Sequence, residues 1–273
     1  MSKKFYTLKN DLVFKNVFLK NPKRIKWLLD GIFNMNLEIY NISNCELYKD
    51  RLYIRSKTVD SIIDTNFAYI NMELNDTFND NKKMRNFYYH ISYLHQLVHV
   101  NDDYVNIDKP VIQINLNVSQ SDTLKIINKY SINDSMSYDE YLKIFYIINI
   151  NIDSIIDKWY NELNQDINYF NRYKYLLIIG MDEEKLKNLE VDDDMIKEIK
   201  KDVITLNKSP EFYQVMTEEE DNRRMMNTMF KEGVERGIEQ EKISNARMMK
   251  KENIKTSIIS KVTGLDTNTI MNL

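Results

Sequence analysis

The sequence predicts an α/β (α+β) fold in which helices flank a mixed central sheet of four or more strands. Two adjacent runs within residues 59–75, an alternating run at 111–118 and a nearly continuous apolar run at 143–150 are typical of strands. The segments around them have the apolar spacing of amphipathic helices. Elements of these two kinds pack in layers around one core.

The first predicted element is a short amphipathic helix at residues 10–21. Asn10 stands in the place of an N-cap and Asp11 follows it. Asp11 therefore has two interpretations. It is a charge that stabilises the start of the helix, or it is an acid that the helix carries under an active site.

A second helix is predicted at residues 23–33, after the break at Pro22, with Trp27 and Leu28 facing inward. A small basic cluster at its start is interpreted as a solvated face rather than a phosphate contact. It consists of Lys23, Arg24 and Lys26.

The most informative pattern is a pair of short runs, 59–64 and 68–75, separated by turn residues, which predicts a β-hairpin or two adjacent antiparallel strands. Every second side chain of the later run shares a face. Glu73 and Asn75 lie on the polar face, and Asp60 lies on the neighbouring strand. The apolar face consists of Ala68, Ile70, Met72 and Leu74.

Acids on two paired strands, such as Asp60 and Glu73, can converge on one point. Two carboxylates at one point disfavour each other's ionised form until a cation lies between them. Oxygen ligands on rigid strands suit Mg²⁺, which accepts one or two carboxylates together with waters. The alternative is that both acids are solvated residues on a strand face.

Asp60, the thirteen-residue gap to Glu73 and the Met-Glu-Leu-Asn sequence at 72–75 resemble the active-site core of PD-(D/E)XK nucleases. The similarity is greatest to the recombination-promoting nuclease (Rpn-like) family, also described as PD-(D/E)XK family transposases, and covers most of residues 5–120. Three further passages resemble that family: the opening helix at 8–18, the Tyr-rich helix at 85–96, and residues 102–104 followed by 111–115.

The resemblance implies a PD-(D/E)XK restriction-endonuclease-like core and a DNA endonuclease that hydrolyses phosphodiester bonds with Mg²⁺ or Mn²⁺. Asp60 and Glu73 would hold the metal, and Asn75 would orient the attacking water. It also implies DNA as the partner, in a setting of recombination, mobile elements or phage conflict. The supporting residues would be Asp11, Arg85, Tyr89 and Gln96.

Asn75 departs from the family pattern, which has Gln at this position, and from the wider superfamily, which has Lys. Asn keeps the carboxamide but is one methylene shorter than Gln and carries no charge. This departure leaves two hypotheses, an active nuclease and a catalytically weakened nuclease fold that binds DNA or a protein partner. A third hypothesis is a helical assembly protein.

Residues 82–100 are predicted as a helix that packs its apolar stripe on the sheet. Arg85 on the opposite stripe is suited to phosphate contact, although a Tyr-containing stripe is also typical of a core or an interface. His95 and His99 have a spacing that could ligate zinc, but no third ligand accompanies them, and zinc is not predicted. The apolar stripe consists of Met84, Phe87, Tyr88, Ile91, Leu94, His95 and Val98.

The composition bounds the classes of function. A net charge of −3 gives no overall basic surface for nucleic acid. The single cysteine, Cys45, excludes an intramolecular disulfide framework. No apolar run reaches the length of a membrane span and no signal peptide is recognised, so we expect a cytoplasmic protein without membrane contact.

Three regions are predicted: a nuclease-like core at 1–152, a helical region at 153–216 and a charged tail at 217–273. The Met-rich segment at 217–252 is interpreted as an extended helix or a linker to a partner. The last residues, 253–273, resemble a small helix–turn–helix without a basic face, which favours packing or dimerisation over DNA reading. A homo-oligomer (dimer) through the helical regions is therefore expected.

Overall fold

The computed structural model describes residues 4–47, 57–76, 79–97, 108–119, 126–133, 135–137 and 139–273; within these ranges the side chains of 44–47, 57–60, 95–96, 141–142 and 219 lie outside the description. The chain divides into two compact units, Met1–Asn207 and Lys208–Leu273. In the part of the chain so described, no helix is both long and apolar enough to cross a membrane.

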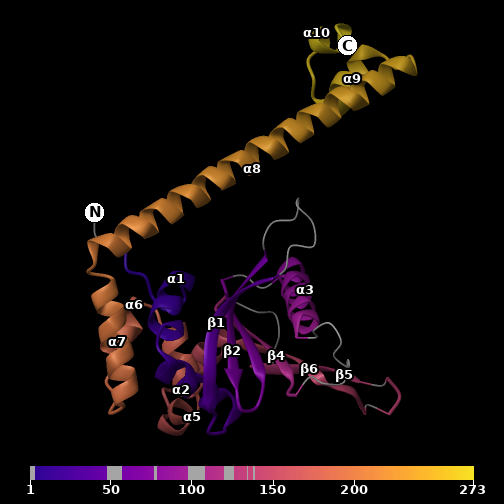
Figure 1. Cartoon of the computed structure of the whole chain (residues 1–273). Helices are drawn as coiled ribbons and strands as arrows, with labels where there is room; N and C mark the ends of the chain where they lie inside the picture. The colour runs from indigo at the N-terminus through magenta and orange to yellow at the C-terminus, as the bar shows by residue number, and fades with distance from the viewer. Residues whose placement is uncertain are drawn as a thin grey trace. The chain divides into compact units, whose positions relative to one another are not determined.

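The first unit is built on a six-stranded mixed sheet, which confirms the predicted mixed central sheet (Figure 1). Its order is β1-β2-β3-β4-β6-β5, with antiparallel pairing from β1 to β3, parallel pairing from β3 through β4 to β6, and antiparallel pairing of β5 with β6. The sequence pattern does not predict β1 or β5. The strands are β1 (Ile39–Leu47), β2 (Lys57–Thr65), β3 (Tyr69–Asn75), β4 (Val111–Asn117), β5 (Ile127–Asn133) and β6 (Glu140–Asn151).

Helices precede, cross and follow this sheet (Figure 1). Before it lie α1 (Asp11–Phe14), the π-helical turn η1 (Lys15–Leu19) and α2 (Pro22–Phe33). The crossover from β3 to the parallel strand β4 is α3 (Asp80–Gln96). After it lie α4 (Ile152–Asp157), the π-helical turn η2 (Lys158–Glu162), α5 (Ile167–Gly180), α6 (Glu183–Asn188) and α7 (Asp194–Leu206).

The predicted cap of the first helix is confirmed, since the Asn10 side chain accepts a hydrogen bond from the backbone N–H of Val13 at 3.2 Å. α1, α2 and α4 contact the sheet at β3, β1 and β4, and α5 packs on α2 and α4. The close approach of α2 and α5 requires Gly31, because a Cβ at this position would overlap the ring of Tyr175. The apolar side chains of the sheet are buried, among them Ile63, Ile70, Met72, Ile114 and Leu116.

The interpretation of the basic cluster as a solvated face is wrong for Arg24, which is buried. Its guanidinium donates to Asp202 of α7 at 2.7 Å and to the carbonyl of Val17 at 3.0 Å. A charge is buried only where such partners replace water. Arg24 therefore joins α7 to the N-terminal helices instead of facing solvent.

The second unit begins with a 42-residue helix, α8 (Pro210–Lys251), followed by α9 (Thr256–Thr263) and α10 (Thr267–Met271). Ser209 caps α8 through the backbone N–H of Phe212, with Pro210 in the first turn. Gly264 ends α9 in the left-handed region at φ 74°, and Asp266 caps α10. The segment at 217–252 is therefore an extended helix.

A small core holds the end of this unit together. It consists of Ala246, Ile259, Leu265 and Ile270, which are buried. Farther back on α8 several apolar side chains are exposed, namely Met225, Met226, Met229, Phe230, Val234 and Ile238. This pattern is compatible with the expected self-association, which stays a prediction.

Candidate functional site

The face of the sheet that α3 covers carries a band of polar residues. On β3, Asn71, Glu73 and Asn75 alternate with the apolar residues, as the sequence predicts. In parallel strands, residues in register share a face. The register pairs these three residues, in order, with Gln113, Asn115 and Asn117 of β4. On the other side of β4, Asn115 pairs with Asn149 of β6 and Asn117 pairs with Asn151. We call these eight side chains the polar band.

Amide hydrogen bonds link the polar band across the three strands. Asn71 donates to Gln113 at 2.5 Å, Gln113 to Asn115 at 3.1 Å, and Asn115 to Asn149 at 2.7 Å. From α3, Asn86 donates to Asn115 at 2.8 Å. Buried amides lose water, and these bonds replace much of what is lost. Asn115 is the centre of the network, since its amide bonds three neighbours.

A second row of the band starts at Asn75, which donates to Asn117 at 3.2 Å. Asn117 in turn donates to Asn151 at a long 3.5 Å. The carbonyl oxygen Oδ1 of Asn75 is buried and has no hydrogen-bond partner among the described residues. The same holds for Oδ1 of Asn71. A buried acceptor without a partner is costly, which makes each of these oxygens a candidate ligand for a metal or a water.

Glu73 is the buried carboxylate of the band, with 3% of its surface exposed. Nη2 of Arg85 lies 3.4 Å from Oε2 of Glu73. The same guanidinium donates to Asn86 at 3.0 Å and lies over the ring of Tyr89 at 5.6 Å. The side chain of Arg85 is 42% exposed, so it contacts both the buried carboxylate and the solvent. The structure thus brings Glu73, Arg85 and Tyr89 together.

The other predicted site residues have different positions. Asp60 belongs to β2 and Gln96 ends α3, and both side chains lie outside the described part of the chain. Asp11 is paired with Lys15, the first residue of η1, at 2.7 Å and is half exposed, which agrees with the helix-start interpretation. The side chain of His95, together with His99 and residues 102–104, also lies outside the description.

The predicted orientation of α3 is wrong for most of its apolar stripe. Met84, Tyr88 and Ile91 are 51%, 55% and 41% exposed. The buried stripe is polar or amphipathic and consists of Asn86, His90 and Tyr93. The physical reason is the polar band beneath the helix, because Asn86 satisfies Asn115 where an apolar side chain would leave it unbonded.

Metal binding depends on the donors that the polar band offers. Glu73 supplies a carboxylate, and Asn75 supplies an amide oxygen that no described residue bonds. Oxygen donors on rigid strands, completed by waters, fit Mg²⁺ and fit a soft metal poorly. Among the residues with described side chains, no three His, Cys, Asp or Glu residues cluster. The sequence predicts Asp60 as the second carboxylate of such a site, and its side chain lies outside the described part of the chain.

His90 lies under α3 with its ring against Phe145, the ring centroids being 4.5 Å apart. Burial lowers the pKa of His90 to about 4, and the backbone of Val111 offsets part of this effect. The neutral imidazole is therefore the native form at neutral pH. No role for His90 is predicted from the sequence. Its position directly after Tyr88 and Tyr89 in a helix gives only a weak indication that it is buried.

We expect His90 to make the first unit acid-sensitive. A folded pKa near 4 against about 6.5 in the unfolded chain means that the unfolded state binds more protons between these values. The free energy of unfolding is therefore highest above pH 6.5, and it falls by about 3 kcal/mol as the pH is lowered toward 4. Urea unfolding at each pH, followed by tryptophan fluorescence, measures this free energy. The signal reports on the first unit because both tryptophans, Trp27 and Trp159, belong to it.

The His90→Leu variant is the comparison for this measurement. Other groups titrate in both proteins, so the difference between the two curves isolates His90. We expect the difference to change by about 3 kcal/mol between pH 7 and pH 4. Parallel curves would show that His90 is protonated in the folded state or is not buried.

No family model, curated protein or solved structure matches the chain. The interpretation of the polar band therefore depends on its own residues and geometry.

Proposed function

We propose that the polar band, together with Asp60, is the active site of a Mg²⁺-dependent DNA endonuclease of the PD-(D/E)XK type, similar to the recombination-promoting nucleases. The observation that carries this proposal is Glu73, a buried acid in register with Asn115 and between the amides of Asn71 and Asn75 on its own strand. Its carboxylate is an oxygen donor held on a strand, the kind of ligand that suits Mg²⁺. Its ion-pair partner Arg85, at 3.4 Å, has a side chain that is 42% exposed and is suited to contact a phosphate.

The second acid of the proposed site is Asp60 of β2. β2 pairs with β3 through Ile62–Asn71, Ile63–Ile70 and Asp64–Tyr69. The hydroxyl of Ser61 contacts the carbonyl of Met72, which agrees with the same register. Asp60 precedes Ile62 by two residues on β2, beyond the last paired position and next to an irregularity in the pairing of β2 with β1. We propose that its carboxylate approaches Glu73 from this neighbouring strand, because two carboxylates at one point favour a divalent ion between them.

Each residue then has a defined task. Asp60 and Glu73 hold the ion, which when bound lowers the pKa of a water and stabilises negative charge on the phosphate. Asn75 offers Oδ1 to orient that water, while its amide nitrogen is fixed by Asn117. Arg85, exposed at the edge of the band, offers a guanidinium to the phosphate of DNA.

The test is cleavage of supercoiled plasmid by the purified full chain in Mg²⁺, in Mn²⁺ and in EDTA. We expect nicked or linear product with either metal and none in EDTA. Equal cleavage in EDTA would contradict a metal-dependent nuclease and would indicate a contaminant.

A second candidate function is favoured by the burial of the polar band. Glu73 and Asn75 are buried, and most amides of the polar band bond each other. A scaffold that binds DNA or a protein partner without cutting would tolerate such closure. Absence of cleavage with both metals, combined with retarded migration of DNA in a gel-shift assay, would select this alternative.

A further inference from the structure

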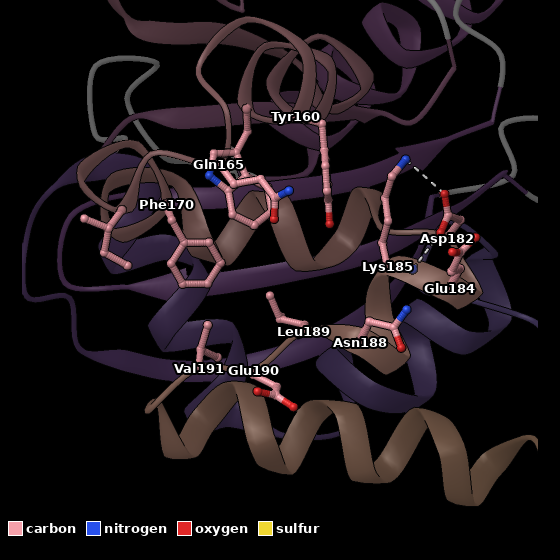
Figure 2. A pocket seen from close by; sticks show the side chains of 12 residues that line it. Tyr160, Gln165, Phe170, Asp182, Glu184, Lys185, Asn188, Leu189, Glu190 and Val191 are labelled. Atoms are coloured by element: carbon pink, nitrogen blue, oxygen red, sulfur yellow. Dashed lines mark hydrogen bonds and ion pairs between the residues drawn. The ribbon is translucent and has the colours of Figure 1, made fainter.

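A cavity of about 690 Å³ opens in the first unit, at residues that the polar band does not include. Its walls are η2, the turn before α5, α5 itself, and α6 with the segment that follows it (Figure 2). The volume lies within the range of small-molecule sites, which is about 300–1,000 Å³.

The backbone around the cavity is held in an unusual conformation. η2 is a π-helical turn, a feature frequent at functional sites. Asn164 and Gln165 follow at φ 45° and 60°, in the left-handed region that costs free energy for residues other than glycine. Hydrogen bonds fix this turn, from Gln165 N–H to the carbonyl of Trp159 at 2.8 Å and from the Trp159 indole to the carbonyl of Asp166 at 3.1 Å. The wall is therefore formed before any ligand binds.

One side of the cavity is aromatic. Tyr160 and Phe170 line it, and Trp159 packs between them with ring centroids 4.8 and 5.2 Å away. Figure 2 shows Tyr160 between Lys185 on one side and Gln165 and Phe170 on the other, with its hydroxyl directed into the open space. Burial raises the pKa of Tyr160, and the carboxylate of Asp182 adds to the effect, so the phenol is a neutral donor.

The charged lining is acidic. The lining contains three acids, Asp182, Glu184 and Glu190, and one cation, Lys185. Lys185 is already engaged, since its ammonium lies 3.0 Å from Asp182 and 4.8 Å from the ring centroid of Tyr160. The cavity thus holds a protein cation between an aromatic face and a carboxylate, and it leaves two further carboxylates for a second cation.

We propose that this cavity binds a small organic cation, an amine or guanidinium on an apolar stem, whose charge lies at the acidic lining to which Glu184 and Glu190 belong and whose stem lies against Tyr160 and Phe170. Cations are attracted to aromatic faces and to carboxylates together, and an anion would meet a net charge of −2 from the lining side chains. This cation would come either from a free polyamine or from a basic side chain of a peptide.

The test is calorimetric titration of the full chain with spermidine, with N-acetylarginine amide and with phenylacetate. We expect saturable binding of at least one cation and none of the anion. Binding of spermidine alone assigns a free amine, and binding of the arginine amide alone assigns a peptide side chain. Failure of both cations to saturate at millimolar concentration would overturn the proposal.

Variants separate the cavity from general attraction to an acidic protein. Glu184→Gln with Glu190→Gln should weaken binding about tenfold, and Tyr160→Leu should weaken it about threefold or more. The matched control, Glu183→Gln with Asp192→Asn, removes the same charge from nearby exposed residues outside the lining. Equal loss in the control and in the cavity variant would contradict a site. None of these residues belongs to the polar band, so DNA cleavage should not change.

Discussion

Replacing Glu73 with glutamine will lower metal-dependent DNA cleavage at least about a hundredfold and leave the chain folded. Glutamine keeps the volume of the buried side chain, but it removes the charge that holds the ion. Asp60→Asn should have an effect of the same size, because both acids are proposed to bind one metal. Initial rates of plasmid nicking measure the loss, and tryptophan fluorescence reports whether the first unit stays folded.

The matched control for this pair is Asp64→Asn. Asp64 lies on the same strand as Asp60, but it forms an ion pair with Lys109 at the other end of β2. This variant removes an equal charge from the same strand, so its cleavage rate should stay within a few-fold of wild type. An unchanged rate in Glu73→Gln or in Asp60→Asn would refute the assignment of that acid.

The second large effect is expected at Asn75. Asn75→Ala removes the amide oxygen that no described residue bonds, and it should lower cleavage by roughly ten- to a thousandfold, the range for one positioned polar group. Asn75→Gln should keep or raise the rate, because it restores the carboxamide at the length typical of the related nucleases. Metal affinity should stay nearly constant across these proteins, since the ion is held by carboxylates.

Asn151→Ala is the comparison for Asn75→Ala, and we expect it to lower cleavage less, because Asn151 is not proposed to orient the attacking water. Asn151 is a buried amide in the same row of the polar band, two strands away. Cleavage by Asn75→Ala at the wild-type rate would remove Asn75 from the mechanism. A gain of cleavage in Asn75→Lys, from a wild type without it, would instead indicate a nuclease weakened at this one position.

β2 and β3 could be predicted because the first is a short run rich in β-branched residues and the second alternates strictly. Glu73 and Asn75 on β3 lie on the face that the period of two requires. β1 and β5 escape prediction because polar residues interrupt any alternation, and both are edge strands with one free side. Their placement depends on tertiary pairing rather than on local pattern.

The orientation of α3 could not be predicted from its hydrophobic pattern alone. An apolar stripe is expected to face the core, but the sheet beneath α3 is polar at Asn115, and Asn86 is the residue that matches it. A signal was present in β4, where Gln113, Asn115 and Asn117 occupy every second position. Such spacing indicates a polar sheet face, and it would have predicted amides on the covering helix.

Arg24 and the cavity at Tyr160 could not be predicted from the sequence for a different reason. Arg24 is paired with Asp202, far away in sequence, and spacing along one helix gives no sign of that partner. The cavity depends on a π-helical turn and two left-handed residues, and no local propensity signals this backbone. The predicted self-association of the tail is not tested by these observations and stays a prediction.

The central claim is that Asp60 and Glu73 together hold one divalent ion on the polar band, and titration with Mn²⁺ followed by electron paramagnetic resonance tests it most directly. Even the loss of a supporting partner costs metal affinity about tenfold or more, so the loss of a ligand should cost at least as much. The account predicts a single Mn²⁺ site in the wild type, weakened at least about tenfold in Asp60→Asn and in Glu73→Gln and unchanged in Asp64→Asn. Equal Mn²⁺ affinity in all four proteins would contradict it.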